Sequence, residues 1–177
     1  VVLPLAARAS DNIKTFEFLG FSEDGNKYML KVVDANRGDT FVVKALSDNK
    51  TLKALPLEGV RDVKKLLDQT KKHFKITDKG KDDQTSPDGR FTFMAVPRGE
   101  KLLLNVMKGN KTATYQTYRL EKGDNGSVPK VQLKQIFWAK DGHKMVVILH
   151  KKLVDQNGID ADEAYGYEFF GGSLNFK

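Results

Sequence analysis

The stretch GFSEDGNKYML, residues 20–30, contains the turn signal that sets the fold class. Asp24-Gly25 favours a tight turn, because glycine tolerates a positive φ and an aspartate side chain can bond to its own backbone. Aromatic residues precede the turn, and Tyr28, Leu30 and Val32 follow it at alternating positions. This order predicts a strand, a turn and a second strand.

The same order of residues occurs twice more along the chain. TSPDGRFTFMAV spans residues 85–96, and IFWAKDGHKMVVIL spans residues 136–149. The aspartates of the three Asp-Gly pairs stand at positions 24, 88 and 141, so they are 64 and 53 residues apart. We therefore expect three related hairpins, which the sequence places either in one sheet or in separate blades.

Further strands are expected between these hairpins. The segments 40–46 and 51–57 read as an antiparallel pair, and residues 101–120 read as a hairpin with Gly109-Asn110 as its loop. In that hairpin the spacing places Leu104 opposite Tyr115, and Tyr115 and Tyr118 on opposite faces. The fold class predicted is mostly β: an antiparallel hairpin or meander sheet domain with propeller-blade-like repeats and one helix near residues 60–74.

The helix is predicted because apolar residues recur at helical spacing from Val60 to Phe74. Residues 61–81 carry eight Lys or Arg and three Asp, whereas residues 153–176 carry five acids and no base. The basic face of this helix is a candidate binding site for a polyanion or an acidic partner. Its residues are Lys64, Lys65, Lys71, Lys72 and Lys75.

Length and composition indicate one domain over residues 1–177, with a hydrophobic core and no disulfide, because the chain has no cysteine. Residues 1–10, VVLPLAARAS, are typical of the end of a secretory signal or of an engineered remnant, or else begin a mature strand. Residues 171–177, with the pair Gly171-Gly172, are expected to form a flexible tail. No apolar run is long enough to span a bilayer.

The segments DNIKTFEFLGFSEDGNKYMLKV and QIFWAKDGHKMVVILHKKL resemble a small family of bacterial predicted secreted proteins of uncharacterised function. The resemblance covers about residues 11–170, although the middle is shorter here. It implies export and a β-rich fold, and it carries no activity or site residues. The Ser-Pro-Asp-Gly turn at residues 86–89 also resembles the repeat of TolB-type β-propellers.

The chemistry-bearing residues give few candidate sites. The acidic loop at residues 155–163 has oxygen donors for calcium, although its spacing is not that of an EF-hand. These donors are Asp155, Asn157, Asp160 and Asp162. No other cofactor is indicated, and the histidines lack metal-like spacing.

These observations favour a secreted or periplasmic, non-enzymatic domain that binds a protein partner in the cell envelope. One alternative is a hydrolase whose carboxylate site is assembled from Asp24, Asp88 and Asp141; it requires these turns to converge and their carboxyl pKa values to be raised. A second alternative is a polyanion-binding protein that uses the basic helix. Nucleic-acid binding is not expected, because base-stacking aromatics are not interleaved with the cations. The sequence leaves the oligomeric state open.

Overall fold

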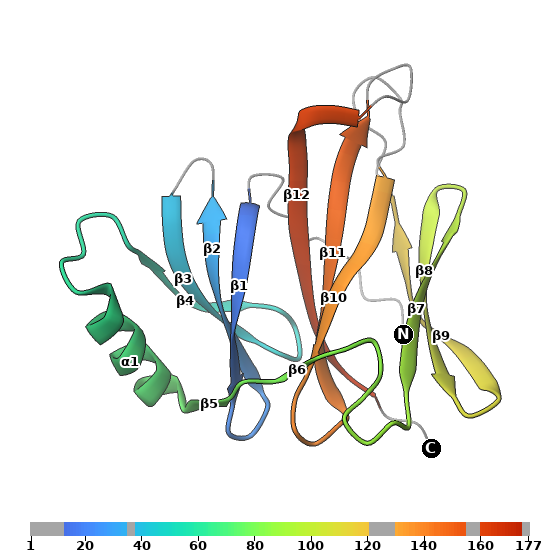
Figure 1. Cartoon of the computed structure of the whole chain (residues 1–177), viewed down its shortest axis with the longest axis horizontal. Coiled ribbons are helices and arrows are strands. Elements are labelled where there is room, and N and C mark those ends of the chain that lie inside the picture. The colour runs from blue at the N-terminus through green and yellow to red at the C-terminus, as the bar shows by residue number, and fades with distance from the viewer. Residues whose placement is uncertain (1–12, 35–37, 121–129, 155–159, 175–177) are drawn as a thin grey trace.

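The computed structural model describes residues 13–34, 38–120, 130–154 and 160–174. These residues form three antiparallel sheets, which we call sheets A, B and C, and one helix, α1 (Figure 1). The predicted fold class, mostly β with antiparallel meanders and a single helix, is confirmed.

Sheet A is a meander made by the N-terminal part of the chain, in the order β4-β3-β2-β1-β5. The Asp24-Gly25 turn joins β1 to β2. The predicted pairing of residues 40–46 with 51–57 is confirmed by β3 and β4. The strands are β1 (Ile13–Ser22), β2 (Lys27–Asp34), β3 (Gly38–Ala45), β4 (Thr51–Pro56) and β5 (Ile76–Asp78).

Helix α1 (Val63–Phe74) lies against the outer face of sheet A. Asp62 caps its start by accepting a hydrogen bond from the Lys65 backbone N–H, and Lys75 ends it in the left-handed conformation at φ 53°. The helix therefore begins three residues later than Val60, where the apolar spacing had placed its start. Leu66, Leu67 and Phe74 pack on buried residues of sheet A.

Sheet C has the order β7-β8-β9, with β7 (Thr92–Arg98), β8 (Lys101–Lys108) and β9 (Lys111–Arg119). The Gly109-Asn110 loop is confirmed, but the register shifts between Leu104 and Asn105, so Leu104 lies opposite Gln116 and not Tyr115. The extra residue in β9 is Tyr115. Because of this extra residue, Tyr115 and Tyr118 both face the core, although they are three positions apart. The prediction that they lie on opposite faces is wrong.

Sheet B contains the last strands of the chain, in the order β12-β11-β10-β6. They are β6 (Lys81–Asp82), β10 (Lys130–Trp138), β11 (Lys144–Val154) and β12 (Asp160–Ser173). Gly171 and Gly172 lie inside β12 and not in a flexible tail, and Leu174 after them is 3% exposed. A Cβ on Gly171 would lie 2.7 Å from the Leu46 carbonyl oxygen, so the missing side chain allows close packing of sheets A and B.

The layers run in the order α1, sheet A, sheet B, sheet C (Figure 1). One apolar cluster fills the space between sheets A and B, and a second fills the space between sheets B and C. Residues 145–149 of β11 alternate between these clusters and are all 0 to 1% exposed. Sheet B, which holds the last strands of the chain, therefore lies between sheets A and C. The order of the sheets in space thus differs from their order along the chain, whereas successive propeller blades follow the chain.

Buried polar contacts also join the layers. Asn49, at φ 58° in the β3–β4 turn, accepts hydrogen bonds from the Tyr28 hydroxyl at 2.8 Å and from the Gly171 backbone N–H. On the other side of sheet B, the Tyr118 hydroxyl donates to the carboxylate of Glu168, which is 5% exposed. The Asn49–Gly171 bond thus joins sheet A to sheet B, and the Tyr118–Glu168 bond joins sheet C to sheet B.

Candidate functional site

The three Asp-Gly turns share one pattern of hydrogen bonds. In each, the glycine N–H donates to the carbonyl three residues earlier, at 2.8, 2.9 and 3.0 Å, and the glycine φ lies between 67 and 72°. In each, the aspartate Oδ1 accepts the backbone N–H two residues later. The turns belong to different sheets: the first joins β1 to β2, the third joins β10 to β11, and the second precedes β7 as a turn closed by a single bridge from Thr85 to Thr92.

Serine completes the first two turns. The Ser22 hydroxyl donates to Asp24 Oδ1 at 2.6 Å and accepts the Lys27 backbone N–H at 2.9 Å. Ser86 does the same for Asp88, at 2.7 Å. Ala139 stands at the corresponding position of the third turn. The two serines thus have their hydroxyls committed to the turn, as expected of turn residues.

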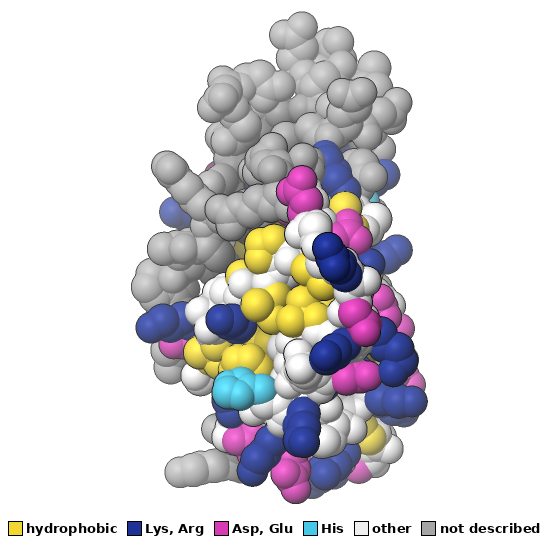
Figure 2. Space-filling view, turned by 90° about the vertical axis from the view of Figure 1, so that its left-hand side faces the viewer, with side chains coloured by type: hydrophobic (Ala, Val, Ile, Leu, Met, Phe, Trp, Pro, Cys, Tyr) yellow, Lys and Arg dark blue, Asp and Glu magenta, His cyan; other side chains and the backbone are white. Residues whose placement is uncertain are grey.

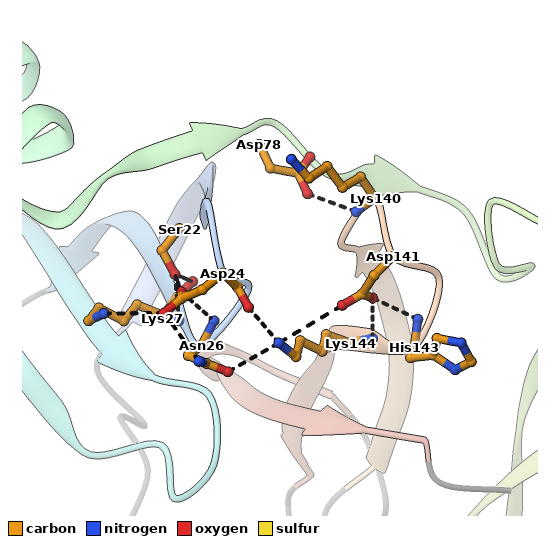
Figure 3. A network of polar contacts seen from close by, with 9 residues as sticks. All are labelled: Ser22, Asp24, Asn26, Lys27, Asp78, Lys140, Asp141, His143 and Lys144. Carbon is orange, nitrogen blue, oxygen red and sulfur yellow. Dashed lines mark hydrogen bonds and ion pairs between the residues drawn. The ribbon is translucent and has the colours of Figure 1, made fainter.

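The three turns lie together along one edge of the molecule. Lys144 Nζ donates to the Asp24 carbonyl and to Asn26 Oδ1 at 3.1 Å, which joins the first turn to the third (Figure 3). Arg90 Nη2 lies 3.1 Å from His143 Nε2, which joins the second turn to the third. Asp78 accepts the Lys140 backbone N–H at 2.7 Å, which ties β5 to the same edge. The three turns therefore converge as the carboxylate alternative requires.

The carboxylate alternative also requires raised carboxyl pKa values, but the pKa values of Asp24 and Asp88 are lowered. The hydroxyl of Ser22 and the backbone N–H of Asn26 lower the pKa of Asp24 to about 2. The hydroxyl of Ser86 and the backbone N–H of Arg90 lower the pKa of Asp88 to about 2. A carboxyl group with such a pKa is ionised at neutral pH and is a poor proton donor or acceptor there. The cluster works as a set of polar links between sheets, and its geometry gives no acid and base pair.

The lysines proposed for polyanion binding lie on α1 and just beyond its end. Lys64 and Lys71 follow one line along α1, while Lys65 and Lys72 follow another about 100° around the axis. Lys75 lies beyond the helix end, and Lys64 is paired with Asp68 at 2.9 Å. Figure 2 shows this side of the molecule, where Lys and Arg side chains alternate with Asp and Glu around an apolar area. The surface is of mixed sign, and polyanion binding by these lysines stays a prediction.

The calcium candidates lie outside the residues whose side chains the structure describes. Asp155 and Asn157 fall in the undescribed segment 155–159, and Asp160 and Asp162 belong to β12 but their side chains are not described. Among the residues that are described, no group of three or more His, Asp or Glu side chains is arranged to hold a metal ion. The calcium site stays a prediction.

The outer face of sheet C is a feature that the sequence reasoning missed. Residues 102, 104 and 106 of β8 are buried against sheet B, so residues 101, 103, 105 and 107 lie on the opposite face. The strand register arranges this outer face in four rows. They are Arg98–Lys101–Arg119, Val96–Leu103–Thr117, Met94–Asn105–Thr114 and Thr92–Met107–Thr112.

No described element packs on this outer face. Met94 is 38% exposed, and Val96, Leu103 and Met107 are half-buried. The signal in the sequence was the composition of residues 92–119, which hold five Lys or Arg and a single acid, Glu100. The face is therefore partly apolar and basic at one end.

No family model matches the chain, no curated protein matches it, and no solved structure matches it. The resemblance to bacterial secreted proteins thus stays a prediction. Within the described part of the chain, α1 is too short and too polar to cross a membrane.

Proposed function

We propose that this chain is a protein-interaction domain that binds its partner through the outer face of sheet C. The observation that carries the proposal is a three-stranded sheet whose inner face is buried in the core and whose outer face is uncovered by any described element. A sheet face with several apolar side chains in adjacent rows has more hydrophobic surface to bury than a single exposed side chain offers.

Binding is favoured over catalysis because of how the polar residues are used. The clustered aspartates accept backbone hydrogen bonds inside their own turns, and two of them have a pKa held near 2. A hydrolase of the expected kind needs one carboxyl group with a raised pKa to act as the acid. The arrangement therefore supports a structural role for the turns and leaves sheet C as the working surface.

We propose further that the domain acts in the cell envelope, as a secreted or periplasmic protein. The support is the absence of cysteine from the sequence and the resemblance to exported proteins. Fractionation of cells that express the natural gene tests this location directly. Recovery of the protein in the cytoplasmic fraction alone would contradict it.

The docking face is tested by site-specific photo-crosslinking in those cells. We expect a photoreactive amino acid at position 94 to give one discrete, saturable adduct, because Met94 is the most exposed apolar residue of the proposed surface. The matched control is position 52, since Leu52 is a similarly exposed apolar residue, at 41%, on edge strand β4 of sheet A. Adducts from both positions, or from position 52 alone, would refute docking on sheet C.

A further inference from the structure

We infer that the partner docked on sheet C is an acidic amphipathic protein segment, with its carboxylates gathered at one end of an apolar stripe. This inference rests on the proposed function and names the chemistry of the partner. It follows from the distribution of charge and apolar side chains over the four rows of the outer face.

Three cations stand side by side in the end row. Arg98 is directly opposite Lys101, which is directly opposite Arg119, across three adjacent strands. Side chains at directly opposed positions have Cβ atoms about 5 Å apart, where like charges destabilise the sheet. None of the three forms an ion pair with a carboxylate of the described residues. Glu100, in the turn between Arg98 and Lys101, is the one acid of residues 92–119, so the row has a net positive charge that an incoming anionic group would reduce.

The remaining three rows hold four apolar side chains among four threonines and one asparagine. Val96 and Leu103 are neighbours in the second row, and Met94 and Met107 lie in the third and fourth. From Lys101 to Met107 the strand advances six residues, about 20 Å at 3.3 Å per residue. A partner that matches this layout is about 20 Å long in all, which is about 13 residues of α-helix, with two or three carboxylates at one end and an apolar stripe along the rest.

Other occupants fit the face less well. A second copy of the chain would bring the same outer face, which has no carboxylate to meet the cation row, and burying unpaired cations is costly. A nucleic acid would need stacking partners, but the aromatic residues of sheet C, Phe93, Tyr115 and Tyr118, belong to the core side. A sulfated polysaccharide offers charge but nothing apolar to cover Leu103 and Met94.

The test uses the full chain, labelled for amide NMR, and four defined probes. The first probe is a 14-residue helical peptide with three glutamates at one end and a leucine stripe, and the second is the same peptide with lysines in place of glutamates. The third is a heparin fragment, and the fourth is vesicles containing anionic phospholipid. We expect the glutamate peptide alone to shift the amides of β7, β8 and β9.

Two charge reversals separate the face from bulk attraction. Arg119→Glu should weaken glutamate-peptide binding about tenfold, because it places an acid in the cation row. Lys65→Glu makes the same kind of charge change on the exposed surface of α1 and should leave binding unchanged. Both positions are exposed, so both variants should fold.

Three outcomes overturn the inference. Shifts of sheet C produced by heparin or by vesicles but not by the glutamate peptide would assign the face to a polyanion or a lipid surface. Shifts confined to α1 would place acidic binding elsewhere, and no shift with the glutamate peptide up to about 1 mM would remove the acidic partner. None of these results affects an adduct formed at position 94, so docking on sheet C is judged separately.

Discussion

The central position of sheet B predicts that two neighbouring residues of β11 are equally sensitive to truncation. Ile148 belongs to the cluster between sheets A and B, Leu149 belongs to the cluster between sheets B and C, and both are 0% exposed. Truncation of either side chain to alanine removes three carbon atoms, which is about 2.4 kcal/mol at 0.8 kcal/mol for each buried methylene. The cavity left behind adds to this, so we expect Ile148→Ala and Leu149→Ala each to destabilise the fold by about 3 to 4 kcal/mol.

Urea unfolding followed by tryptophan fluorescence measures this, because Trp138 is buried beside β11 in the adjacent strand. The midpoints should fall while the slopes stay constant, which shows that native stability changed and not the unfolded state. Leu52→Ala in β4 is the control, since Leu52 is 41% exposed and its truncation should cost less than about 1 kcal/mol. If either Ile148→Ala or Leu149→Ala costs less than about 1 kcal/mol, one face of sheet B is open and the layer order is wrong.

Three further predictions concern the polar contacts and the close packing of glycine. Ser22→Ala should raise the pKa of Asp24 from about 2 toward 3.8, and NMR titration of the Asp24 carboxyl group measures this change. In the native turn the ionised Asp24 stabilises the fold above about pH 4, and this stabilisation is lost as the pH falls toward 2. Tyr118→Phe removes the hydroxyl donated to a buried carboxylate of β12 and should cost about 1 to 3 kcal/mol in thermal unfolding; an unchanged midpoint would contradict this bond. Gly172→Ala places a Cβ 2.1 Å from the Tyr115 hydroxyl oxygen and should cost about 1 to 3 kcal/mol, part of which Tyr115→Phe in the same chain recovers; full tolerance would show that the strands are not this close.

Local structure was predictable where it depends on near neighbours in the chain. The turns at Asp24-Gly25 and Asp141-Gly142 and the Gly109-Asn110 loop all occur, because their backbone conformations are set by the residues inside them. The amphipathic helix occurs for the same reason, with its start fixed by the Asp62 cap. The candidate site was less predictable, because the cation row of sheet C is formed by residues from three strands whose register sets them side by side.

The misplaced expectations have a common physical origin. The bulge at Tyr115 shifts the register by one residue, and a shift of one residue exchanges the two faces of a strand. The shift puts both tyrosines into the core, where the Tyr118 hydroxyl bonds to Glu168 of sheet B. The contact that favours the shift is therefore made with a different sheet. Gly171 and Gly172 were read as a flexible end because glycine weakens a strand, but here the absence of a Cβ lets β12 approach Leu46 and Tyr115.

The sequence by itself determined the fold class, the turns and the separation of basic and acidic segments, because each depends on residue type and on spacing over a few positions. Only the tertiary structure decided that sheet B lies between sheets A and C and that the three aspartate turns meet on one edge. It also decided that sheet C has a face on which no described element packs, with three cations in one row. The physical reason is that strand pairing and sheet stacking join residues tens of positions apart, and those contacts depend on which apolar faces bury one another, a choice that no local pattern encodes.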